Sequence, residues 1–106
     1  MRKSKHRSRL EILADMLYVT GKRSKKTHIM YGANLSYELT NRYLTRLLEA
    51  GLIESRNDEY VVTEKGREFL KRFEEYSERR QELNEQINDV NNKRETLLKR
   101  YLNQSS

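Results

Sequence analysis

The chain has 106 residues, of which 35% are apolar and 36% are charged, and it contains no cysteine. A chain of this length allows one small domain with an extension, and its lean apolar content favours burial of further surface by dimerisation. The lack of cysteine excludes disulfide bonds and thiolate metal sites, and two histidines are too few for a metal cluster. No apolar run approaches the length of a membrane span.

The positive charge is concentrated at the front of the chain. The net charge is +6. Residues 1–28 hold nine Lys or Arg against Glu11 and Asp15, a net charge of +7, whereas residues 29–63 carry −2 and residues 64–106 carry +1. A localised basic region indicates a polyanionic partner, most simply nucleic acid. For Met1 to Arg7, which we expect to be flexible, a solubilising tail is the alternative.

Capping residues predict two helices at the start of the chain. Ser8 and Glu11 have the spacing of a capping box, and Gly21 ends the first helix. A short, strongly basic loop follows. Thr27 is expected to cap a brief second helix that ends near Gly32.

A third helix is predicted from Tyr37 to Ala50, with Ser36 as its cap and Gly51 after its end. The 3.6-residue period separates two faces. We expect Tyr37 and Tyr43 in the core rather than against a base. Three helices with a tight turn before the third form a helix-turn-helix. The apolar face carries Tyr37, Thr40, Tyr43, Leu44, Leu47 and Leu48, and the polar face carries Glu38, Asn41, Arg42, Thr45, Arg46 and Glu49.

Two β-prone stretches then predict a wing. They are residues 52–55 and 60–63, separated by a polar turn at 56–59. Thr63 caps a long helix that runs to about Leu102, in which Gly66 costs a little helicity. The expected fold is mainly α, an α+β winged helix-turn-helix with a long C-terminal helix. The expected domains are 1–63, the basic tail with the winged helix-turn-helix DNA-binding domain, and 64–106, a coiled-coil dimerisation helix.

The long helix carries a heptad repeat. Its positions, at alternating steps of four and three, are Phe69, Phe73, Tyr76, Arg80, Leu83, Ile87, Val90, Arg94, Leu97 and Tyr101. This spacing predicts a coiled-coil seam that forms a dimer interface. Arg80 and Arg94 share one heptad class, so each would face its own copy in a parallel dimer. In an antiparallel dimer, the numbers of facing residues add up to a constant that defines the register. If this sum is 170, Arg80 faces Val90 and Arg94 faces Tyr76; a register with a sum of 177 is also acceptable. We predict an antiparallel homodimer; a helix folded back on its own domain is the alternative.

Several strings in the chain resemble a known family. Residues 29–37 read IMYGANLSY, Tyr43-Leu44 follow, residues 47–53 read LLEAGLI, and residues 60–66 read YVVTEKG. Together they resemble the archaeal ten-kilodalton winged-helix proteins, described as small chromatin-type DNA-binding proteins, with relatives predicted to be transcriptional regulators. The resemblance covers nearly the whole chain. YGANLSY is its fairly specific part, whereas LLE-x-GLI is shared by many winged helices. The resemblance implies a homodimer joined by an antiparallel coiled coil of the C-terminal helices, with a winged domain at each end.

The third helix of a helix-turn-helix enters the major groove, and its N-terminal half contacts base edges. Asn and Arg there can form paired hydrogen bonds with adenine and guanine. Because Glu38 and Glu49 repel phosphate, we expect phosphate contacts from other elements to matter more. The predicted base-side residues are Asn41, Arg42, Thr45 and Arg46. The predicted phosphate contacts are Lys22, Arg23, Lys25 and Lys26 in the loop, Thr27 and His28 at the start of the second helix, and Arg56 in the wing.

These features predict a homodimer that binds double-stranded DNA and acts as an archaeal architectural protein or a transcriptional regulator, in the cytoplasm and associated with the nucleoid. The modest charge of the third helix favours the architectural role, whereas Asn41 and Arg42 favour sequence recognition. A winged-helix protein–protein interaction module that does not bind DNA is the alternative. The sequence shows no phosphate-binding loop or nucleophile arrangement, so we expect no enzymatic activity, cofactor or small-molecule substrate.

Overall fold

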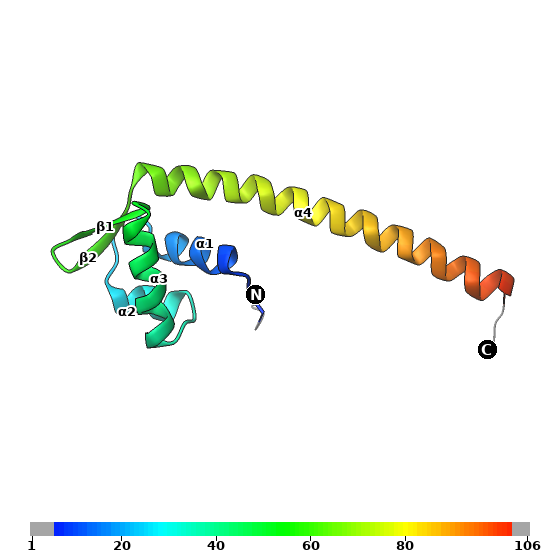
Figure 1. Ribbon diagram of the computed structural model, residues 1–106, viewed down its shortest axis with the longest axis horizontal. Helices are drawn as coiled ribbons and strands as arrows, with labels where there is room; N and C mark the ends of the chain where they lie inside the picture. Colours follow the sequence, from blue (N-terminus) through cyan, green and yellow to red (C-terminus); the bar gives the residue numbers. More distant parts are fainter. Residues whose placement is uncertain (1–5, 103–106) are drawn as a thin grey trace. The chain divides into compact units, whose positions relative to one another are not determined.

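A computed structural model describes residues 6–102, and their arrangement confirms the predicted fold. Three short helices are followed by a β-hairpin and one long helix (Figure 1). The elements are α1 (Arg9–Thr20), α2 (Lys26–Gly32), α3 (Tyr37–Glu49), β1 (Ile53–Arg56), β2 (Glu59–Val62) and α4 (Glu64–Leu97), with a π-helical turn at Leu98–Leu102. No helix in the described range is long and apolar enough to span a membrane.

Of the four predicted N-terminal helix caps, those at Ser8, Ser36 and Thr63 are confirmed and the one at Thr27 is wrong. Ser8 Oγ accepts from the Glu11 amide and the Glu11 carboxylate accepts from the Ser8 amide, which completes the capping box. Ser36 Oγ accepts from the Leu39 amide at 3.1 Å. Thr27, however, lies inside the first turn of α2, which begins after Lys25 without a side-chain cap.

The earlier start of α2 follows from a pairing that the sequence did not indicate. The Ser24 amide donates to the Tyr60 carbonyl at 3.0 Å, and the Tyr60 amide donates to the Ser24 carbonyl at 2.8 Å. This antiparallel bridge holds the basic loop against β2, and the backbone at Lys25 is still extended. The helix can therefore begin at the next residue, Lys26.

The wing is a tight two-stranded hairpin. Ile53 pairs with Val62 and Arg56 pairs with Glu59, so only Asn57 and Asp58 remain in the turn. Both have positive φ, 51° and 66°, as a type I′ turn requires. The turn is thus two residues long rather than the four predicted, since left-handed backbone at these positions lets the strands pair up to the turn.

The hydrophobic core lies between the three short helices, the wing and the first turns of α4. Tyr43 packs against it as predicted, and so do Phe69 and Leu70 of α4. Tyr37, predicted to lie in the core, is 63% exposed. It is the first residue of α3, and its side chain lies at the open end of the helix, over no preceding turn. The buried cluster is Met16, Leu17, Ile29, Ala33, Leu44, Leu47, Leu52, Ile53 and Val62.

The first turn of α4 closes the C-terminal end of α3. Thr63 caps α4 as predicted: its hydroxyl accepts from the Gly66 amide at 3.1 Å and donates to the Gly51 carbonyl at 2.6 Å. Lys65 Nζ donates to the Ala50 carbonyl at 2.7 Å. Gly66 is buried here, and a Cβ at this position would lie 2.3 Å from the Leu52 carbonyl oxygen. Glycine is therefore required, rather than merely tolerated.

The chain forms two compact units, the first ending at Phe73 and the second beginning at Glu74. The first turns of α4 belong to the first unit because Phe69 and Leu70 pack on its core. The packing boundary thus lies beyond Thr63, after which we expected the dimerisation helix to begin.

Candidate nucleic-acid interface

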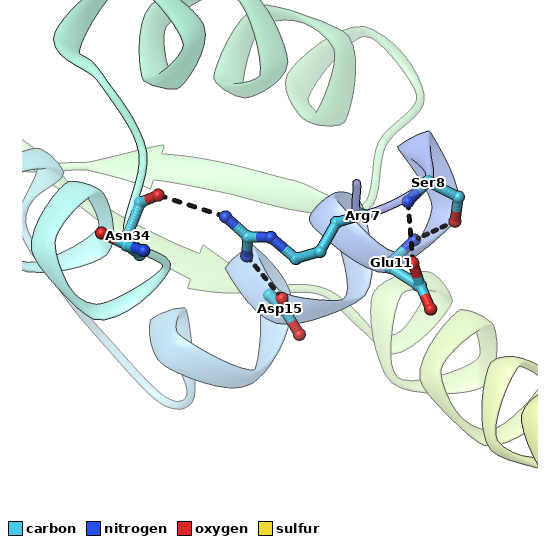
Figure 2. Close-up of polar contacts among 5 residues, drawn as sticks. All are labelled: Arg7, Ser8, Glu11, Asp15 and Asn34. Carbon is cyan, nitrogen blue, oxygen red and sulfur yellow. Dashed lines mark hydrogen bonds and ion pairs between the residues drawn. The ribbon is translucent and has the colours of Figure 1, made fainter. Parts of the chain in front are cut away.

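Arg7 fixes the turn that leads into α3 (Figure 2). Its guanidinium lies 2.6 Å from Asp15 Oδ2 of α1 and donates to the Asn34 carbonyl at 3.1 Å. Only 15% of the Arg7 side chain is exposed. Asn34 has a left-handed backbone, φ 57°, and Arg7 holds its carbonyl in place. Arg7 is therefore a structural residue and does not belong to a flexible tail as we predicted; residues 1–5 lie outside the described range.

The basic loop between α1 and α2 presents three cations at the surface. Lys22, Arg23 and Lys25 are exposed on either side of the buried Ser24. Arg23 Nε lies 3.3 Å from Glu59 Oε1 of the wing. No ion pair is found for Lys22 or Lys25 within the described part of the chain, so their charges are available to an anion.

The wing contributes less positive charge than the sequence indicated. Arg56 Nη2 lies 2.9 Å from Glu54 Oε1, and its Nε donates to the same oxygen at 3.2 Å. With Arg23 already beside Glu59, both predicted cations near the wing have a carboxylate partner. A phosphate would have to compete with these carboxylates for the two guanidinium groups.

The outward face of α3 presents two arginines. Arg42 and Arg46 are exposed at positions i and i+4, one turn apart, and make no ion pair among residues 6–102. Thr45, predicted as a base contact, is exposed, but its hydroxyl donates to the Asn41 carbonyl at 3.0 Å. Thr45 therefore offers lone pairs and a methyl group outward. Thr27 and His28 are also exposed on α2.

Lys26 and Asn41 contact each other, although we had predicted them as separate DNA contacts. Lys26 Nζ donates to Asn41 Oδ1 at 2.7 Å and lies 5.1 Å from the centre of the Tyr37 ring. The pKa of the Tyr37 hydroxyl is lowered, first by a hydrogen bond with the Asn41 side chain and then by the positive charge of Lys26. The three side chains, from the start of α2 and the first two turns of α3, form one polar group, which we call the donor cluster.

Within the second unit, α4 carries the predicted seam as an exposed apolar strip. Ile87 is 56% and Val90 is 62% exposed, values far above those of core residues. Arg94 is exposed with its guanidinium 3.2 Å from Glu95 Oε2, and Arg80 is exposed as well. Phe69 is already packed against its own domain, and Phe73 is half-buried. The remaining members of the exposed strip are Tyr76, Leu83, Leu97 and Tyr101.

The chain belongs to the winged helix-turn-helix family, whose model matches residues 6–81. The structure is similar to the crystal structure of Sso10a-2, described as a DNA-binding protein from Sulfolobus solfataricus, with a TM-score of 0.75 and 30% identity over 81% of this chain and 95% of that one. The archaeal resemblance seen in the sequence is thereby confirmed.

Two proteins of Methanocaldococcus jannaschii are also similar in sequence. Uncharacterized protein MJ0290 is 36% identical over 70 residues, which are 65% of this chain and 33% of that protein. Uncharacterized protein MJ0287 is 30% identical over 64 residues, 59% of this chain and 66% of that protein. The chain thus spans about a third of the first relative's length and just under two thirds of the second's.

Proposed function

We propose that this chain is a homodimeric DNA-binding protein that acts as an archaeal chromatin-type architectural protein or as a transcriptional regulator. The outward face of α3 carries this proposal. Arg42 and Arg46 are exposed there, without an ion pair in the described range, on the helix that enters the major groove in helix-turn-helix proteins. Membership of the family and the description of Sso10a-2 as a DNA-binding protein support it.

The phosphate contacts are expected on the helix and loop side rather than on the wing. Lys22 and Lys25 are exposed with no ion pair among residues 6–102, and they precede α2. Arg23 and Arg56 face Glu59 and Glu54, which lower their net contribution to an anion site. Lys22 and Lys25 should therefore position the domain on the duplex while Arg42 and Arg46 enter the groove.

The evidence for the proposed dimer comes only from residues of the second unit. Its exposed apolar strip follows a heptad period, and such a strip in a water-soluble helix is stabilised by burial against a partner. The antiparallel orientation is proposed because it places the seam arginines against apolar residues instead of against each other; the ion pair of Arg94 with Glu95 of its own helix is compatible with either orientation. A second copy of the same helix is the partner whose pattern matches.

The test is fluorescence anisotropy with a random-sequence duplex across a salt series. We expect log affinity to fall linearly with log salt, with a slope of about −0.9 per phosphate neutralised. Replacing Arg42 and Arg46 by Ala should weaken binding with little change of slope, whereas replacing Lys22 and Lys25 by Ala should reduce the slope by about 2 for each bound domain. The matched control replaces Lys71 and Lys99 by Ala, because both are exposed, carry the same charge and lie outside the predicted seam.

If the Arg42/Arg46 double variant and the control lose affinity equally, general charge is responsible and α3 does not enter the groove. If the protein binds no random-sequence duplex at low salt, the architectural role is excluded, and a strictly site-specific regulator or the interaction module is left. Nuclease footprinting on genomic fragments separates the two DNA-binding roles: discrete protected sites indicate a regulator, and uniform coverage indicates an architectural protein.

We also propose that the protein is not an enzyme and uses no cofactor. Among residues 6–102, no group of three or more His, Asp or Glu side chains could hold a metal ion. The polar side chains brought together on α2 and α3 are donors suited to contact with an anion. Binding, rather than bond cleavage, is the chemistry that these groups support.

A further inference from the structure

We infer that Tyr37, Asn41 and Lys26 act together as a specificity determinant that selects guanine and rejects adenine at one base pair of the bound site. This inference rests on the proposed DNA binding. It differs from the sequence interpretation, in which Asn41 pairs with adenine and Lys26 contacts phosphate. The difference comes from the way in which the three side chains orient one another.

The orientation of the Asn41 amide is fixed by Lys26. An ammonium group can only donate hydrogen bonds, so the Asn41 atom that lies 2.7 Å from Lys26 Nζ must be the oxygen. The amide nitrogen therefore lies on the other side of the group. Recognition of adenine by asparagine needs both the oxygen, to accept from the adenine amino group, and the nitrogen, to donate to N7. The oxygen is already bound to a cation that repels an amino group.

Tyr37 completes the cluster from the first turn of α3. A hydrogen bond with Asn41 lowers the pKa of the Tyr37 hydroxyl, as expected when the amide N–H donates to the phenol oxygen and stabilises its charged form. Hydrogen bonds from Asn41 and Lys26 then face the phenol oxygen, and its O–H remains to donate. Lys26 lies 5.1 Å from the centre of the Tyr37 ring and adds a positive charge beside it.

The groups that the donor cluster presents to a ligand are mainly hydrogen-bond donors, and its remaining lone pairs, on Asn41 Oδ1 and the Tyr37 oxygen, lie near the positive charge of Lys26. The donors are the second amide N–H of Asn41, the O–H of Tyr37 and the remaining N–H groups of Lys26. In the major groove, guanine presents two adjacent acceptors, O6 and N7, whereas adenine presents an acceptor beside an amino donor. Two donors of the cluster can therefore form two hydrogen bonds with guanine. With adenine, one of these hydrogen bonds is lost, and the donor repels the adenine amino group.

The position of the cluster suits contact with a base. Tyr37 is the first residue of α3 and Asn41 lies one turn later, in the N-terminal half of the helix that contacts base edges in this fold. Tyr37 is largely exposed, so its hydroxyl is accessible. Lys26 is half-buried at the start of α2 and contributes mainly by orienting Asn41.

The experiment is selection of bound sequences from a randomised duplex library, followed by anisotropy on duplexes that differ at a single base pair. For the wild-type protein we expect guanine at one position, with about 5- to 150-fold discrimination against adenine, the range of one paired base contact. Lys26→Met should release the Asn41 oxygen and shift the preference at that position toward adenine. Tyr37→Phe, which keeps the ring, should reduce the preference for guanine. Lys25→Met removes the neighbouring charge and is the matched control.

The outcomes separate this inference from the proposed function. If wild-type protein binds no duplex, the proposed function fails as well. If it binds with a steep salt slope but the selected sequences do not change with Lys26→Met or Tyr37→Phe, only the inference is overturned. If Lys26→Met weakens all duplexes equally and lowers the salt slope by about one per bound domain, as we expect for Lys25→Met, then Lys26 is a phosphate contact and the inference is also overturned.

Discussion

Gly66→Ala should destabilise the protein, although helix propensity alone predicts the opposite. Alanine is favoured over glycine in a helix by about 1 kcal/mol. In this structure, however, the new Cβ would lie 2.3 Å from the Leu52 carbonyl oxygen and 2.7 Å from Val62 Cγ1. That oxygen cannot easily move, because it accepts from the Thr63 amide at 3.0 Å. The backbone of α4 must therefore shift away from the wing.

The magnitude follows from the contacts that such a shift disturbs. Overpacking a core costs about 1–3 kcal/mol. Weakening the Thr63 cap costs about 1 kcal/mol, and weakening the hydrogen bond from the Thr63 amide to Leu52 costs about 1 kcal/mol more. After subtraction of the propensity gain, we expect the free energy of unfolding to fall by about 2–4 kcal/mol.

Urea unfolding followed by circular dichroism, at one fixed protein concentration, measures this change. We expect the midpoint to fall by about 1–2 M urea with an unchanged slope. Asn92→Ala is the control, because Asn92 is exposed on α4 outside the predicted seam and only its helix propensity changes; it should be neutral or slightly stabilising. A Gly66→Ala protein as stable as the wild type would refute the close approach of α4 to Leu52.

Three further predictions concern other contacts. Arg7→Ala should lower the free energy of unfolding by about 1–2 kcal/mol in urea melts, since a partly buried ion pair and a bond to a carbonyl are lost, and Arg7→Lys should recover part of it; equal stability of all three proteins would contradict the role of Arg7. Because its pKa is lowered, Tyr37 should ionise below the ordinary range of a tyrosine, and Tyr37→Phe should remove phenolate absorbance at the low-pH end of the titration; an unchanged low-pH end would argue against this environment. Since the chain has no cysteine, introduced cysteines can test how the proposed dimer pairs: Leu97→Cys protein mixed with Phe73→Cys protein should form a mixed disulfide if the antiparallel register sums to 170. If the register sums to 177, Leu97→Cys protein should instead cross-link with Arg80→Cys protein. Efficient cross-linking of Leu97→Cys protein to itself would indicate a parallel dimer.

The sequence was sufficient for features whose signals are local. The caps at Ser8 and Ser36 and the end of α1 at Gly21 depend on residues within one or two helical turns of each other. The hairpin followed from two β-prone stretches around a polar turn, although the length of the turn depended on the left-handed backbone of Asn57 and Asp58. The heptad of α4 was equally visible, because its period needs no tertiary information.

Features that depend on contacts between distant residues were missed. Arg7 and Asn34 are 27 positions apart, and Lys26 and Asn41 are 15 apart, so no spacing rule connects them. Gly66 was predicted only to lower helix propensity slightly, because the Leu52 carbonyl that it packs against precedes the wing in the sequence and is 14 residues away. For the candidate interface, residue types indicated which side chains could bind DNA, but only the structure showed that Lys26 and Asn41 are bound to each other.

The closure of α3 by the first turn of α4 decides how the chain can be divided for experiments. A fragment that ends at Thr63 would retain every predicted DNA contact, yet it would leave the Ala50 carbonyl without Lys65 and strip Phe69 from the core. Such a fragment should lose amide protection in the last turn of α3, so a failure to bind DNA would report unfolding rather than the loss of a dimer. A fragment that ends at Phe73 keeps the closure and removes the second unit, so it lacks the proposed dimer interface and is the form in which binding by one domain can be measured.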